Sequence, residues 1–86
     1  MKNKTLKLKI SPMVKIAYID IPEELKGYKY IACTTRIVNI PEVFNRISGF
    51  ISIENDEIKL EIISKDVKEN DLVEFEIYVV ADDKNL

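Results

Sequence analysis

The sequence predicts an all-β protein, a single β-rich domain over residues 1–86 whose six short strands form a small barrel-like structure or a sandwich. Three observations support this fold class. Apolar and polar residues alternate with a period of two along most of the chain, as in strands with one buried face. Proline, glycine and Asn-Asp positions separate the alternating runs and mark turns. Only one short helical turn is expected, at about 41–47.

The predicted strands, in chain order, cover residues 5–10, 15–21, 28–38, 50–53, 58–63 and 72–80. The second, "KIAYIDI", is apolar on both faces, so we expect a central strand that is covered on both sides. In the third, Cys33 is in phase with Ile31 and Ile37, which predicts a buried small hydrophobe. The third strand places Tyr28, Tyr30, Thr34 and Arg36 together on the opposite face.

The best-specified local contact is a hairpin around the stretch "ENDE". Asn55 and Asp56 tolerate the positive φ angles that a two-residue hairpin turn requires. The alternation on both sides of this turn then sets Ile53 opposite Ile58. The sequence therefore predicts both the turn and the register of one strand pair.

The tripeptide Ile-Pro-Glu occurs twice, at residues 21–23 and 40–42, and a glycine and an aromatic residue follow each copy. Proline is favoured at the first position of a helical turn. Gly27 and Gly49 are expected to take the left-handed conformation that ends such a turn. The repeat thus predicts two corners, each a strand, a cap and a new strand.

The segment 67–77, "VKENDLVEFEI", resembles the turn and strand found in many small nucleic-acid-binding barrels of the OB and cold-shock type. Asn70 stands where those barrels carry glycine, and asparagine tolerates the same left-handed backbone. The aromatic RNA-binding motifs of cold-shock domains are missing from the sequence. The resemblance implies an OB- or SH3-like barrel and identifies no family.

Charge is distributed unevenly along a chain whose net charge is −2. Residues 1–53 carry nine Lys or Arg against four Asp or Glu, a balance of +5, and residues 54–86 carry four against eleven, a balance of −7. Such a split can steer a partner or bring two copies together head to tail. The simpler interpretation is that each strand has a solvated charged face.

The residue types of catalysis and metal binding are scarce. Histidine is absent, the single cysteine cannot form an internal disulfide, and no Gly-rich phosphate loop occurs. The acidic stretch "ENDE" at residues 54–57 lacks the length and the order of ligands of a calcium-binding loop. We expect a non-enzymatic protein with no catalytic residue, no metal and no cofactor.

The N-terminus lacks the apolar centre of a signal peptide, which favours the cytoplasm and no membrane association.

The candidate binding residues are Tyr28, Lys29, Tyr30, Arg36 and Tyr78. Tyrosine is enriched at protein interfaces, which favours a protein partner or a homo-oligomer; nothing implies a small-molecule substrate. Ile63 and Val80 are expected to join Tyr78 in an apolar patch, and the edge strand 5–10 could pair with another chain. The alternative is a barrel that binds single-stranded nucleic acid through Tyr28, Lys29, Tyr30, Arg36 and the N-terminal lysines. A small regulator or inhibitor from a mobile element is a third hypothesis.

Overall fold

The structure is a computed structural model that describes residues 2–38, 46–68 and 72–82. Over these residues it contains six strands and one 3-10 turn, so the prediction of an all-β, six-stranded domain is confirmed. The elements are β1 (Lys2–Ile10), β2 (Ile16–Asp20), η1 (Glu23–Leu25), β3 (Tyr30–Ile37), β4 (Ile47–Glu54), β5 (Glu57–Ser64) and β6 (Val73–Asp82).

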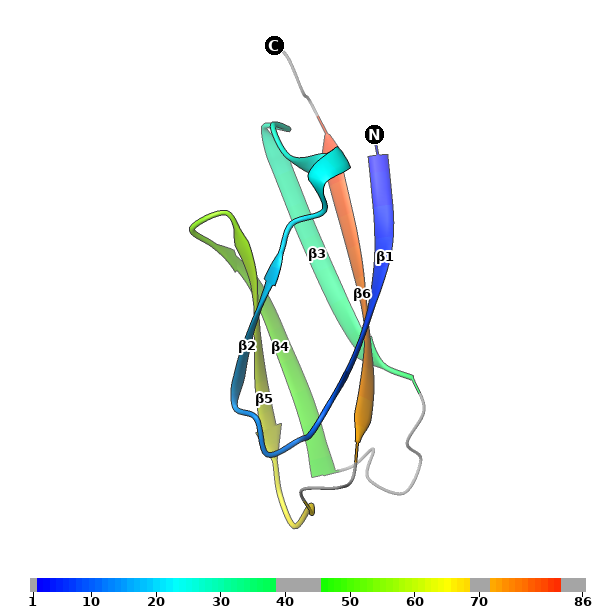
Figure 1. The fold of residues 1–86 in the computed structure, drawn as a ribbon, viewed down its shortest axis with the longest axis vertical. Coiled ribbons are helices and arrows are strands. Elements are labelled where there is room, and N and C mark those ends of the chain that lie inside the picture. Colours follow the sequence, from blue (N-terminus) through cyan, green and yellow to red (C-terminus); the bar gives the residue numbers. More distant parts are fainter. Residues whose placement is uncertain (1, 39–45, 69–71, 83–86) are drawn as a thin grey trace.

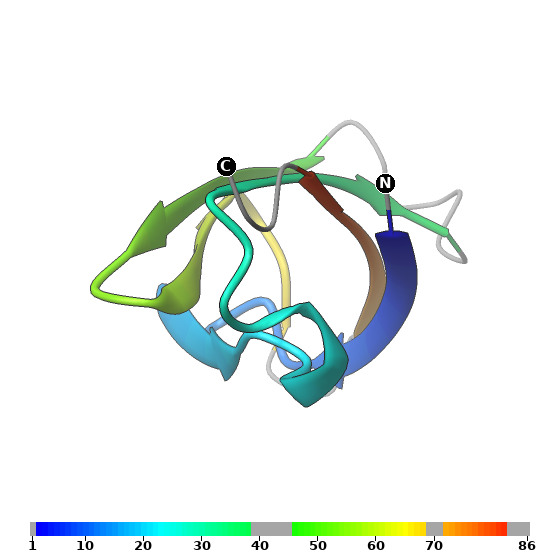
Figure 2. The same ribbon diagram turned by 90° about the horizontal axis from the view of Figure 1, so that it is seen from above.

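Within the described part of the chain the strands form two antiparallel three-stranded sheets (Figure 1). Sheet A has the order β1-β6-β3, and sheet B has the order β2-β5-β4. Figure 2 shows both sheets curving around a common interior, with β3 and β4 side by side along one flank. No ladder joins the two sheets among residues 2–38, 46–68 and 72–82, so the strand pairing is that of a sandwich.

The core lies between the sheets and is supplied mainly by their two central strands. Every second residue of β5 and β6 points inward, as the period-two pattern requires. The buried side chains of these two strands are Ile58, Leu60, Ile62, Val73, Phe75, Ile77, Val79 and Ala81. The alternation predicted for the last strand is confirmed, and β6 extends two residues beyond the predicted end.

The hairpin between β4 and β5 has the predicted turn and register. Asn55 and Asp56 have φ angles of 53° and 62°, as a type I′ turn requires. Ile53 lies opposite Ile58. The same alternation puts Ile53 on the inner face of β4, but it is 37% exposed because it lies one residue from the end of the strand.

The proline-started turn and the left-handed glycine predicted for the first Ile-Pro-Glu corner are confirmed. Pro22 precedes the single turn η1, and Gly27 follows with a φ angle of +86°. Leu25 from this turn is fully buried and packs into the core between the ends of the sheets. Lys4 of β1 donates a hydrogen bond of 2.7 Å from Nζ to Oε2 of Glu24, which ties the turn to the edge of sheet A.

The second corner differs from the prediction at its glycine. Gly49 lies inside β4, and it does not have a positive φ angle. A Cβ atom at this position would lie 2.7 Å from Cε1 of Phe75, so the glycine makes room for the largest core side chain. Most of the helical turn predicted at about 41–47 falls at 39–45, outside the described residues, and Ile47 already belongs to β4.

The segment 15–21 was predicted to be a covered central strand, and this is wrong. β2 is an edge strand of sheet B and pairs only with β5 within the described residues. Its inner positions Ala17 and Ile19 pack against the core, while Ile16 and Tyr18 point outward into solvent. The apolar residues on its outer face are therefore surface residues.

Candidate interaction surfaces

The outer face of sheet A holds three of the five predicted binding residues. The register places Tyr78 of β6 between Thr5 of β1 and Thr34 of β3. Tyr30 and Arg36 lie on the same face at opposite ends of β3. Tyr30 and Arg36 therefore share one face of β3, as predicted, and the strand pairing adds Tyr78 to that face.

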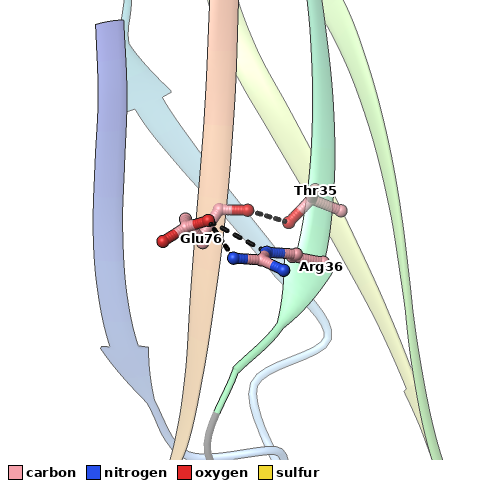
Figure 3. A network of polar contacts seen from close by, with 3 residues as sticks. All are labelled: Thr35, Arg36 and Glu76. Atoms are coloured by element: carbon pink, nitrogen blue, oxygen red, sulfur yellow. Dashed lines mark hydrogen bonds and ion pairs between the residues drawn. The ribbon is translucent and has the colours of Figure 1, made fainter.

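The guanidinium group of Arg36 is occupied by an acidic neighbour. Its Nε and Nη2 atoms each lie 2.9 Å from Oε1 of Glu76 on the adjacent strand (Figure 3). The hydroxyl of Thr35 donates a hydrogen bond of 3.1 Å to the backbone carbonyl of Glu76. Since Arg36 is largely neutralised by this carboxylate, it adds little positive potential to the face.

The uneven charge along the chain becomes interleaved in this sheet. The basic strand β1 pairs with the acidic strand β6, which places Lys7 opposite Glu76 and Lys9 opposite Glu74. Unlike charges directly opposite each other on one sheet face attract. Strand pairing therefore brings much of the positive charge of residues 1–53 next to the negative charge of residues 54–86.

Tyr30 is exposed at the start of β3, beside a shallow hollow. The ammonium group of Lys29 lies 5.2 Å from the centre of its ring, within the range of a cation–π contact. The hollow has a volume of about 530 Å³ and is lined by Tyr30, Ala32 and Val80 among others. Lys29 and Tyr30 therefore form one local unit at the end of sheet A.

Tyr28 does not lie on this face, contrary to the prediction. β3 begins at Tyr30, so the strand alternation does not reach back to residue 28. The positive φ angle of Gly27 redirects the chain, and Tyr28 packs partly buried against the core near Leu25. It lines a separate hollow of about 490 Å³ together with Lys26 and Asp56.

The outer face of sheet B carries an exposed apolar group that sequence reasoning did not assemble. We call it the apolar patch; its members and their exposed fractions are Ile16 (46%), Tyr18 (55%), Phe50 (57%) and Ile63 (61%). The register brings them together: Ile16 and Phe50 flank Glu61 of β5, and Tyr18 lies beside Lys59. Ile63 lies opposite Ser48 at the next outward position of β5.

Ile63 was predicted to form an apolar patch with Tyr78 and Val80, and this is wrong because they lie in different sheets. The sequence did contain a signal for the true patch. It was the run of apolar residues at both alternating positions of 15–21. That run indicated two apolar faces, and only the pairing of β2 as an edge strand shows that one of them is uncovered.

Charged residues lie at the centre and at both ends of the same face. Lys59 is 20% exposed, and its Nζ lies 3.7 Å from Glu54 and 3.8 Å from Glu61. Asp20, Glu57 and Glu54 form an acidic row at the hairpin end. Just beyond the other end of β4 and β5 are Arg46 and Lys65, which are joined by a backbone hydrogen bond of 2.9 Å from the amide of Lys65 to the carbonyl of Arg46. Nη1 of Arg46 donates a hydrogen bond of 2.9 Å to the backbone carbonyl of Asp66.

The surroundings of the single thiol disfavour its reaction. Cys33 lies on the inner face of β3, and burial raises the pKa of its thiol above the ordinary value, which disfavours the nucleophilic thiolate. No group of three or more acidic, cysteine or histidine side chains is placed to hold a metal ion in the parts of the chain that the structure describes. Nor do those parts contain a helix of the length and apolarity needed to cross a bilayer.

The two outer faces therefore differ in character. Sheet A presents alternating charges around Tyr78, and sheet B presents four exposed apolar side chains around Glu61 and Lys59, with an acidic row at the hairpin end. No family model, curated protein or solved structure matches the chain.

Proposed function

We propose that the protein is a non-enzymatic interaction module, a small intracellular subunit or adaptor that docks onto a protein partner or onto a second copy of itself. The observation that carries this proposal is the apolar patch on sheet B. Four large apolar side chains, two of them aromatic, lie about half exposed on adjacent strands of one face. A group of exposed apolar side chains on one face favours protein–protein contact, and aromatic residues are enriched at such sites.

Tyr30 and Tyr78 on sheet A form a secondary contact region in this proposal. Their neighbours are polar or charged, and Arg36 is paired within its own sheet. Charged residues at the rim of an interface influence association rate and selectivity more than affinity. In this proposal, the exposed residues of sheet B therefore contribute most of the binding free energy.

The proposal is tested by light scattering and by pull-down from a lysate of the native host. The informative variant is Phe50→Ser, because this side chain is exposed and its removal leaves the core intact. A matched control is Leu72→Ser, which removes an exposed apolar side chain outside the six strands. A complex or a self-associated species lost only in the Phe50 variant supports the proposal; a strict monomer that retrieves no partner contradicts it.

The alternative function, binding of single-stranded nucleic acid, draws support from the stacking platform of Lys29 and Tyr30. Against it stand the carboxylates interleaved with the lysines of β1 and the Glu76 partner of Arg36. Fluorescence anisotropy with mixed single-stranded oligonucleotides at about 50 mM salt separates the two functions, because phosphate binding is strongest at low salt. Saturable binding that weakens steeply with salt would favour this alternative.

A further inference from the structure

The charges on the outer face of sheet B are arranged along the strand direction. Arg46 and Lys65 lie just beyond one end of β4 and β5, where Nη1 of Arg46 donates a hydrogen bond to the backbone carbonyl of Asp66, and Glu54 and Glu57 lie eight residues along at the other end. The row through Phe50, Glu61 and Ile16 lies midway between these ends. The only other lysine of the face among the described residues, Lys59, is offset by contacts to Glu54 and Glu61.

This polarity makes the face complementary to itself in one orientation. Consider a second copy stacked face to face, with a two-fold axis along the middle row and therefore perpendicular to the strands. The axis reverses the strand direction and keeps each strand over its own counterpart. Glu57 of one copy then faces Lys65 of the other, and Glu54 faces Arg46. A two-fold axis parallel to the strands would instead place acidic end over acidic end, which is repulsive.

The same orientation places the middle rows of the two apolar patches over each other. Residues of the middle row stay at the axis, so Phe50 packs against Phe50 of the other copy, and Ile16 against Ile16. Glu61 also faces Glu61 of the other copy, and Nζ of Lys59 lies 3.8 Å from this carboxylate within each copy. Ile63 comes to lie over the alkyl chain of Lys59, which is four residues before it on the same strand. Packing of two aligned sheets by their faces is a common arrangement in β proteins.

The exposed apolar area suits a dimer of standard size. A fully exposed large apolar residue presents about 200 Å² or more, so the four members of the patch, about half exposed each, present on the order of 450 Å². A stable interface buries about 800 Å² on each partner, of which about 65% is apolar in homodimers. The patch supplies most of that apolar share, and the charged ends supply the polar rim.

We infer that the protein forms a two-fold symmetric homodimer through the outer faces of sheet B, with the strands of the two copies antiparallel. This inference rests on the proposed function and names the partner as a second copy of this chain. Isologous pairing of this kind closes after two copies and leaves no free site for a third.

The decisive experiment uses two charge-reversal variants, Glu57→Lys and Lys65→Glu, in sedimentation velocity over a range of concentrations. Each variant alone places like charges opposite each other at two symmetric contacts, and the dissociation constant should rise about tenfold or more. An equimolar mixture of the two should form a heterodimer of wild-type affinity, because every contact between them is again between unlike charges. Glu23→Lys, with the same change in charge on the exposed turn η1, is the control and should dimerise normally.

Two results would overturn the inference. If the wild-type protein stays monomeric up to millimolar concentration, there is no homodimer. If both variants weaken self-association and their mixture does not restore it, the orientation is wrong. In either case, a pulled-down protein that depends on Phe50 would leave the proposed function standing with a different partner, whereas loss of that capture as well would remove both.

Discussion

Substitution of Gly49 by alanine tests how the glycine in β4 is used. The residue has ordinary strand conformation, so alanine is compatible with its backbone, and removing a glycine from a strand should by itself add about 0.5–1 kcal/mol of stability. The new methyl group would, however, lie 2.7 Å from Cε1 of Phe75 and 3.4 Å from Cδ1 of Leu60. Non-bonded carbon atoms prefer about 3.5–4.0 Å, so the ring edge must move by about 1 Å.

The ring has little room for that movement, since Phe75 and Leu60 are both fully buried in the same cluster. Overpacking of a filled core costs about 1–3 kcal/mol. Steric cost therefore outweighs the backbone gain, and Gly49→Ala should lower the free energy of unfolding by about 0.5–2 kcal/mol. For a domain of this size a loss of 1 kcal/mol lowers Tm by about 4–8 °C.

The assay is urea unfolding monitored by circular dichroism, in a double-mutant cycle with Phe75→Leu. The smaller leucine creates space where the alanine methyl group needs it, so the double variant should be more stable than the sum of the two single effects by at least about 0.5 kcal/mol. A Gly49→Ala protein that is more stable than wild type, or strictly additive effects, would refute the steric explanation.

Three further predictions concern the turn η1 and the single thiol. Gly27→Ala should lower stability by about 1 kcal/mol, because the φ angle of +86° strains any residue with a Cβ although nothing lies within 4 Å; Gly27→Asn should cost less in the same urea assay. The hydrogen bond from Lys4 lowers the pKa of Glu24 below its ordinary value, so the Glu24 carboxyl should titrate by NMR at lower pH than a glutamate in a short peptide, and Lys4→Met should raise its pKa toward the ordinary value. This lowered pKa stabilises the fold above the ordinary glutamate pKa, and the contribution is lost as pH falls through the folded value. Burial raises the pKa of Cys33, so its alkylation rate should still rise with pH where that of a cysteine peptide has levelled off, and unfolding in urea should abolish the difference.

The parts of the fold that follow from neighbouring residues were predictable from the sequence. The hairpin at Asn55 and Asp56 depends on two residues that tolerate positive φ and on the alternation that flanks them. The corner at Pro22 and Gly27 depends on a proline-started turn and a left-handed glycine. Both signals lie within about ten residues of sequence, so no knowledge of strand order is needed.

Features that depend on strand order were not predictable in the same way. Position 49 requires glycine because the ring of Phe75 lies close to it, and this contact joins strands of different sheets. The repeat of Ile-Pro-Glu had instead predicted a backbone role for this glycine. The apolar patch combines residues of β2, β4 and β5, and its members look like core residues until β2 is known to be an edge strand. Tyr28 has the same spacing from Tyr30 as neighbours on one strand face, but it precedes the strand.

The central claim is that the outward positions of sheet B form a binding surface that the fold itself does not need, and one pair of adjacent residues tests it most directly. Phe50 points outward and Ile51 packs inward against the core. In dilute solution, Phe50→Ser should leave the free energy of unfolding within about 0.5 kcal/mol of wild type while abolishing association, and Ile51→Ser should lower it by about 1–3 kcal/mol. A Phe50→Ser protein that is severely destabilised, together with an Ile51→Ser protein of normal stability, would mean that Phe50 points inward and Ile51 outward. That result would contradict the account.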